Sequence, residues 1–291
     1  MLGKLMKYEW KSISKIGCLL LAVMAGITLL AVIYMFSPLF QGIIVGMDDL
    51  NPWMAMLTLG LFLAAVFLYV MTVVGAGYAM MLYLGIRFYK TMYSDQGYLT
   101  HTLPVTPSQL LNSKLFVGTV WLLLLGIGAF VSAIISAFAM AFSILQATGK
   151  TEEAVEIFRE LPVELPEAMA SILGPGVGWF YLVIFLSIVL GPLFNLCILY
   201  GSVTIGQLAK KHKILLGIFT YCGILMILNT FRTTFAYSFN LGFTIEMVHA
   251  VDDMGGILSL STLIQLLINC ALAVGLYLLA GRIVKKHLNL E

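Results

Sequence analysis

A lysine and a threonine that follow a glycine can bind a nucleotide phosphate, and residues 149–151 of this chain read Gly-Lys-Thr. A phosphate-binding P-loop also requires a glycine five residues before Gly149, and Ile144 stands at that position. The motif must follow a buried strand, and no strand is predicted ahead of it. We therefore expect no ATP hydrolysis by this route on this chain.

The sequence also lacks the residue patterns typical of metal sites and of acid-base catalysis. The EExxxR signature of intramembrane CAAX-type proteases is only approximated by Glu152-Glu153 with Arg159, because the spacing is wrong and the segment is too polar to span. No GxSxG nucleophile elbow occurs. The histidines are too scattered for a zinc site: His101, His212, His249 and His287. The sequence predicts no catalytic residues, no metal and no enzyme activity.

A few polar or helix-bending residues lie inside long apolar runs. The amides of Gln265 and Asn269 fall on one predicted helix face, and Asn195 follows one turn after Gly191-Pro192. Proline removes a backbone donor, so these two residues predict a kink. Buried amides in lipid usually bind a neighbouring helix, but they also mark substrate paths. Both interpretations of Asn195, Gln265 and Asn269 remain open.

The apolar runs themselves determine the predicted fold class. Of the 291 residues, 61% are hydrophobic and only 10% are charged, which is far too little charge for a soluble domain of this length. We predict an all-α membrane protein with one transmembrane domain, residues 1–291. Its six predicted spans are residues 16–36, 57–84, 115–145, 177–204, 214–231 and 257–280. The four cysteines fall inside such runs, which predicts buried packing residues rather than disulfides.

The charges predict the orientation of these spans. With both termini in the cytosol, the inner segments hold 13 of the 16 Lys and Arg residues and the outer side holds 11 of the 14 acidic residues. This partition follows the positive-inside rule. We therefore predict a multi-pass protein of the plasma membrane with both termini cytoplasmic. No charged residue lies deep in a predicted span, which argues against a proton-driven carrier.

Three segments outside the spans have their own patterns. Residues 1–15 place lysines opposite an apolar face, which predicts an interfacial amphipathic helix or simply a basic flank that orients the first span. Residues 147–176 form an acidic outer loop, which we expect to be a solvated cap or a collar that attracts cationic substrates. Residues 235–256 are predicted to be an outer re-entrant or interfacial segment. The third span adds a stripe of small residues suited to close helix packing within one chain or between subunits: Ala129, Ala133, Ala137 and Ala141, with Ser132 and Ser136 adjacent.

The cytosolic loop of residues 87–114 is the one long polar segment on the inner side. Thr106-Pro107-Ser108-Gln109 forms a capping box with proline at the first helical position, which predicts the start of the third spanning helix. Before it, Ser94 or Asp95 can cap a short helix that ends at Pro104. This short helix presents Tyr98, Leu99 and Leu103 to a docking partner or to lipid headgroups.

The run DQGYLTHTLPVTPSQLLNSKL resembles the first cytosolic loop of membrane subunits of type-2 ATP-binding-cassette (ABC) transporters, especially the small ones of Gram-positive bacteria. The opening KLMKYEWKS is also similar to theirs. The resemblance extends over the whole chain as architecture and is specific as sequence in these two stretches. It implies a coupling helix between spans two and three that contacts a separate ATPase: Asp95, Tyr98, Leu99, His101, Thr102 and Leu103.

The resemblance implies a function as well. The chain would form the translocation path of an exporter for peptides, drugs or lipids, with ATP and Mg on the partner ATPase and no cofactor of its own. It would pair with a second membrane subunit, identical or different, and would bind no nucleic acid. A non-transporting membrane scaffold or sensor that regulates a partner protein is the alternative.

Overall fold

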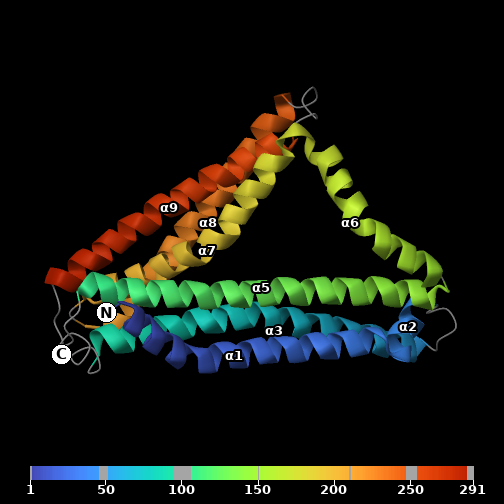
Figure 1. The fold of residues 1–291 in the computed structure, drawn as a ribbon, viewed down its shortest axis with the longest axis horizontal. Coiled ribbons are helices and arrows are strands. Elements are labelled where there is room, and N and C mark those ends of the chain that lie inside the picture. Colours follow the sequence, from blue (N-terminus) through green and yellow to red (C-terminus); the bar gives the residue numbers. More distant parts are fainter. Residues whose placement is uncertain are drawn as a thin grey trace. The chain divides into compact units, whose positions relative to one another are not determined.

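The structure is a computed structural model that describes residues 2–45, 52–94, 106–149, 151–209, 211–246 and 254–286. Within these ranges it is helical, with no strand (Figure 1). The helices are α1 Leu2–Met35, α2 Pro38–Val45, α3 Pro52–Tyr93, α5 Pro107–Ala147, α6 Thr151–Leu173, the short 3-10 helix η1 Gly174–Gly176, α7 Val177–Gly206, α8 Lys213–Glu246 and α9 Met254–Lys286.

The described residues include six helical segments that are long and apolar enough to cross a membrane, which confirms the predicted fold class. The segments are Leu2–Met35, Trp53–Tyr93, Ser108–Ala147, Pro162–Gly206, Lys213–Thr234 and Leu260–Val284. Their surfaces are rich in exposed large apolar side chains, as expected of helices surrounded by lipid. The chain is a multi-pass membrane protein.

Several helices extend beyond the predicted segments. Helix α1 runs without interruption from Leu2 to Met35, so a separate interfacial helix over residues 1–15 is not confirmed. Helix α8 continues through Glu246 and includes much of the segment assigned to the outer surface. Most of the acidic segment forms the single helix α6, which accommodates Pro162 and Pro166.

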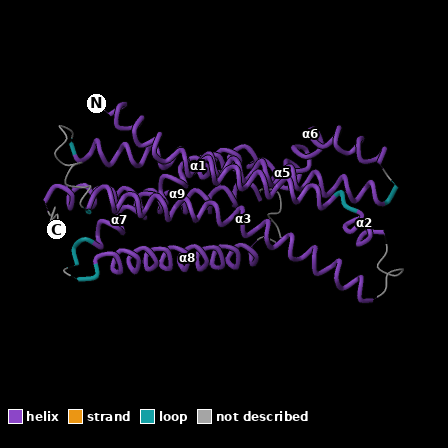
Figure 2. The backbone as a smooth tube through the Cα atoms, turned by 90° about the horizontal axis from the view of Figure 1, so that it is seen from below, coloured by secondary structure: helices purple, strands orange, loops and turns teal. Residues whose placement is uncertain are grey.

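The chain divides into two compact units. Figure 2 shows the described residues as helices joined by short loops. Unit 1 comprises Met1–Lys11, Leu82–Leu123 and Glu167–Glu291, and unit 2 comprises Ser12–Met81 and Leu124–Pro166. Helices α1, α3 and α5 each contribute one part to both units. Each unit is described separately below.

In unit 1, α7 packs along both α8 and α9. Ile198, Leu228 and Leu276 form the buried centre of this packing. The turn between α7 and α8 requires glycine at residue 206, because a Cβ there would lie 2.7 Å from backbone atoms of Lys213 and Gly217. The absent side chain therefore lets the first turns of α8 approach the end of α7 closely.

In unit 2, serine and threonine hydroxyls hold the helices together. Ser132 on α5 hydrogen-bonds Thr28 on α1 at 2.6 Å and Tyr69 on α3 at 2.7 Å. The Ser143 hydroxyl donates to the Met35 carbonyl. The buried face of α5 thus carries serines, whereas the predicted alanine stripe includes exposed Ala133 and Ala137.

Candidate functional site

The loop between α3 and α5 carries the predicted coupling helix. Its residues Asp95, Tyr98, Leu99, His101, Thr102 and Leu103 lie outside the described residues. The structure does describe both flanks of this loop. We call residues 87–94 and 106–114, the end of α3 and the start of α5, the loop base. The contacts of the loop base show which other helices are connected to this loop.

The start of α5 is fixed by the predicted capping box. The Gln109 backbone N–H donates to Thr106 Oγ1 at 3.4 Å, and the Thr106 N–H donates to Gln109 Oε1 at 3.3 Å. These reciprocal bonds satisfy two donors that a helix start otherwise leaves unpaired, and Pro107 occupies the first helical position. The predicted start of the third spanning helix is confirmed.

One carboxylate from the N-terminal helix joins the two sides of the loop base. Glu9 Oε2 accepts from Arg87 Nη2 at 2.8 Å and from Arg87 Nε at 3.1 Å. Glu9 Oε1 accepts from Lys114 Nζ at 2.5 Å. Arg87 belongs to the end of α3 and Lys114 to the start of α5. The two Glu9 oxygens therefore bind cations from the two helices that flank the loop.

This ionic cluster is shielded from solvent. The side chain of Lys114 is 4% exposed, that of Glu9 12% and that of Arg87 21%. Removing charges from water is costly, and their mutual attraction offsets that cost only while all partners are present. The cluster holds two cations and one anion, so its integrity depends on Glu9. Among these three residues, Arg87 retains the most contact with solvent.

A second set of contacts joins the loop base to α7. The Phe88 ring stacks on the Tyr200 ring, with centroids 4.1 Å apart and planes 9° apart. The Tyr93 hydroxyl donates to Thr204 Oγ1 at 3.0 Å. Phe88, Tyr200 and Thr204 are all buried. The last turns of α3 are thus fixed both to the N-terminal helix and to the end of α7.

A glycine on α5, Gly118, allows α5 to pack closely against α7. A Cβ at Gly118 would lie 3.0 Å from a methyl group of Leu196 on α7, so a larger residue would force that side chain to move. Trp121 on α5 packs against Trp10 on α1, with ring centroids 5.0 Å apart. Four helices, α1, α3, α5 and α7, therefore meet around the loop base within unit 1. Close packing of this kind transmits displacement from one helix to the next.

Glu9 was not predicted as a site residue. In the sequence it is only one of the three acids on the predicted inner side, because its partners stand 78 and 105 positions along the chain. The signal that could have found it is local composition. Glu9 is the only acid among the lysines of the first 15 residues. A lone carboxylate in a basic, partly apolar helix is a good candidate for a buried partner.

The polar residues of the spans are not gathered into one site. Asn269 is half-buried, and its Oδ1 accepts from Arg232 Nη2 on α8 at 3.0 Å. Gln265 is half-buried and Asn195 is exposed. Gly191 and Pro192 lie within the continuous helix α7. Asn269 thus makes the helix-to-helix contact expected of a buried amide.

We expect Asn269→Leu to weaken the packing of α9 against α8. The change removes the acceptor for the Arg232 guanidinium, which should cost about 1–2 kcal/mol of stability. Asn269→Asp keeps an acceptor oxygen at the same place and serves as the matched control. Detergent-induced unfolding measures both variants. A leucine variant that is as stable as wild type would contradict this packing role and would favour the interpretation of Asn269 as a residue of a substrate path.

Metal ligands do not cluster in the described part of the chain: no group of three or more His, Cys, Asp or Glu side chains could hold an ion there. All four cysteines are free. Cys197 is buried, as predicted, but Cys18 and Cys222 are exposed on the helix surfaces, so the prediction of burial was wrong for these two. A thiol on a lipid-facing helix needs no polar partner and is tolerated at such a position.

Comparison of the chain with protein families, with curated proteins and with solved structures finds no match.

Proposed function

We propose that this chain is the membrane-spanning subunit of an ABC exporter and is moved by a separate ATPase that docks on residues 95–103. The observation that supports this proposal most is the loop base. Its two helices are joined through Glu9, and α3 is also joined to α7 through Phe88 and Tyr93. Such an anchored base can transmit a displacement of the loop to α1 and α7, as the proposal requires.

The proposed mechanism is mechanical. ATP and Mg bind to the partner ATPase, and closure of the ATPase pair displaces the docked coupling helix. The ends of α3 and α5 follow this displacement, Glu9 passes it to α1, and the Tyr200 and Thr204 contacts pass it to α7. Packed interfaces switch between discrete arrangements rather than deforming continuously, so a small displacement at the loop can shift whole helices. The kink predicted at Gly191-Pro192 is a candidate hinge within α7.

The remaining parts of the proposal follow from the resemblance. The chain pairs with a second membrane subunit, identical or different, in the plasma membrane, and the pair exports a peptide, drug or lipid. The chain itself carries out no catalysis in this scheme. Its contribution is the path and the movement of its helices.

The proposed orientation is tested by cysteine labelling. On a background in which the four natural cysteines are replaced by serine, we expect a membrane-impermeant maleimide to label Glu156→Cys in intact cells. Lys211→Cys is the matched control and should react only after permeabilisation. Both side chains are exposed, so differences in burial do not confuse the comparison. The opposite pattern would overturn the proposed orientation, which rests on the charge partition.

The proposed function is tested by purifying the full chain from its native membrane in mild detergent. We expect a stoichiometric ATPase chain to co-elute and to hydrolyse ATP. If the chain is pure and stable and no ATPase accompanies it, the exporter proposal fails. A regulated partner of another kind in the same preparation would favour the membrane scaffold or sensor.

A further inference from the structure

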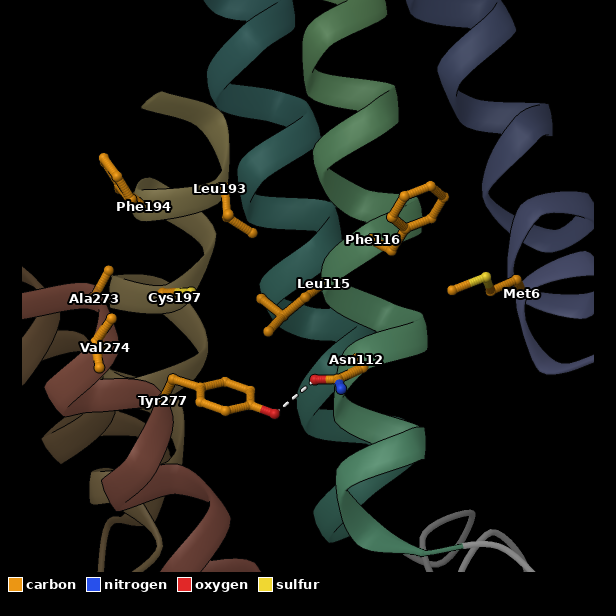
Figure 3. Close-up of a pocket in the computed structure, with 10 residues that line it drawn as sticks. All are labelled: Met6, Asn112, Leu115, Phe116, Leu193, Phe194, Cys197, Ala273, Val274 and Tyr277. Carbon is orange, nitrogen blue, oxygen red and sulfur yellow. Dashed lines mark hydrogen bonds between the residues drawn. The ribbon is translucent and has the colours of Figure 1, made fainter. Parts of the chain in front are cut away.

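A pocket of about 400 Å³ lies within unit 1 between α1, α5, α7 and α9 (Figure 3). This volume falls within the range of small-molecule sites. Phe194, Cys197 and Ala273 form its buried wall. Phe116 and Val274 also line it and are 56% and 52% exposed, so the pocket is open on the side where these two residues lie.

The pocket has one polar end. The Tyr277 hydroxyl donates to Asn112 Oδ1 at 2.7 Å, and Figure 3 shows this pair at the edge of the otherwise apolar lining. Because that bond uses the amide oxygen, the amide nitrogen of Asn112 still carries two N–H donors. Asn112 is itself exposed, so these donors are accessible to a ligand at the pocket entrance.

The polar end and the apolar walls of the pocket lie at different heights along the helices. Asn112 is in the second turn of α5, close to a helix end. Leu193 lines the pocket from the middle of α7, roughly 20 Å along the helix from Gly206. The pocket therefore extends from a hydrogen-bonding group near the helix ends into purely apolar surroundings. The exposed lining residues belong to helical segments that are long and apolar enough to span a membrane, so we expect the open side to face hydrocarbon.

We propose that this pocket binds a single acyl chain, with the carboxylate or ester carbonyl of the chain accepting a hydrogen bond from the Asn112 amide. Apolar walls favour a hydrocarbon tail, and the polar end matches an amphiphile whose head lies at the membrane boundary. The ligand is either a free fatty acid or one chain of a phospholipid, since both carry the same carbonyl chemistry. The proposal is independent of any ATPase partner, because it rests on unit 1 alone.

The first experiment uses the full chain in phosphatidylcholine nanodiscs with palmitate that carries a diazirine near the end of its tail. We expect photolabelling to concentrate on the α7 and α9 walls of the pocket and to be competed by unlabelled palmitate. Val274→Trp fills the pocket from its open side and should reduce this labelling about tenfold. Leu278→Trp is the matched control, one turn along α9 and similarly exposed at 54%, and should label like wild type.

A second measurement addresses the polar end. Asn112→Leu removes the amide donors, and one hydrogen bond to a charged carboxylate corresponds to roughly tenfold in affinity. We expect this variant to bind palmitate about tenfold more weakly and to bind a diazirine-labelled hydrocarbon of equal length unchanged. This difference separates loss of the carbonyl contact from general damage to the pocket.

Phosphatidylcholine with a diazirine in one chain distinguishes the two sources of the ligand. If only one of the two probes labels the pocket and its unlabelled form suppresses that labelling, the ligand comes from the corresponding source, free fatty acid or phospholipid. Either result supports the proposal. Labelling spread evenly over all exposed helix faces, without competition, would mean annular lipid only and would overturn it. Unchanged labelling of a stably folded Val274→Trp variant, or cross-links to a second copy of the chain in place of lipid, would overturn it as well.

Discussion

Replacing Glu9 by glutamine is expected to destabilise this chain by about 3–5 kcal/mol, the cost of leaving a buried charge without its partner. Glutamine has nearly the shape of glutamate, so the loss comes from charge rather than from a cavity. Without the carboxylate, Arg87 and Lys114 repel each other across a neutral amide. The free energy of unfolding, measured by sodium dodecyl sulfate titration of the protein in mixed micelles, is the relevant quantity.

The lysine supplies the control for this prediction. Lys114→Met removes one cation and leaves Glu9 and Arg87 as a neutral pair, so we expect a much smaller loss than for Glu9→Gln. The double variant Glu9→Gln/Lys114→Met should recover most of the stability, because the remaining cation, Arg87, is 21% exposed and can be hydrated. Additive effects of the two changes would show that the cluster contributes no coupling energy and would contradict the prediction.

The second large effect is expected at Leu99 in the coupling loop. Burying a leucine in an apolar cleft contributes about 1.5–3 kcal/mol, and Leu99→Asp both removes this contribution and brings a carboxylate to an apolar contact. Each 1.4 kcal/mol is about tenfold in affinity, so we expect a loss of roughly 100-fold in ATPase binding. The membrane fold should remain intact, because the substitution lies outside the spans.

Leu165→Asp is the matched control for this loop variant. Leu165 is an exposed leucine of α6, 55% accessible, in a segment proposed to lie on the other side of the membrane. It undergoes the same chemical change and should leave ATPase binding unaltered. Co-purification ratio and ATP-dependent transport measure both variants. Wild-type values for Leu99→Asp would remove the main mechanical support for the exporter proposal.

The sequence predicted those parts of the molecule that depend on local pattern. Six apolar runs and the capping box at Thr106 are local signals, and the structure agrees with both. The ends of α1 and α8 were less predictable, because a helix can continue past the apolar run when neighbouring residues tolerate helical backbone. Propensity and hydropathy do not specify such boundaries within a few residues.

The contacts that make up the candidate site could not be predicted from local sequence patterns. Glu9, Arg87 and Lys114 come together only in the folded chain, and hydropathy assigns each simply to a basic or polar flank. The pocket could not be predicted from the sequence either. Its lining, such as Phe194 and Ala273, has the composition of ordinary helix packing, and only the three-dimensional arrangement distinguishes a cavity wall from a contact.

The long separation between Glu9 and Lys114 also has a consequence for biosynthesis. Chains grow at roughly 5–20 residues per second, so Glu9 leaves the ribosome about 5–20 seconds before the lysine that lies 105 residues further along. During that interval the first helix has only some of its final partners. The N-terminal segment therefore completes its native contacts only after the start of α5 has been made, while three of the six spans are still to be synthesised.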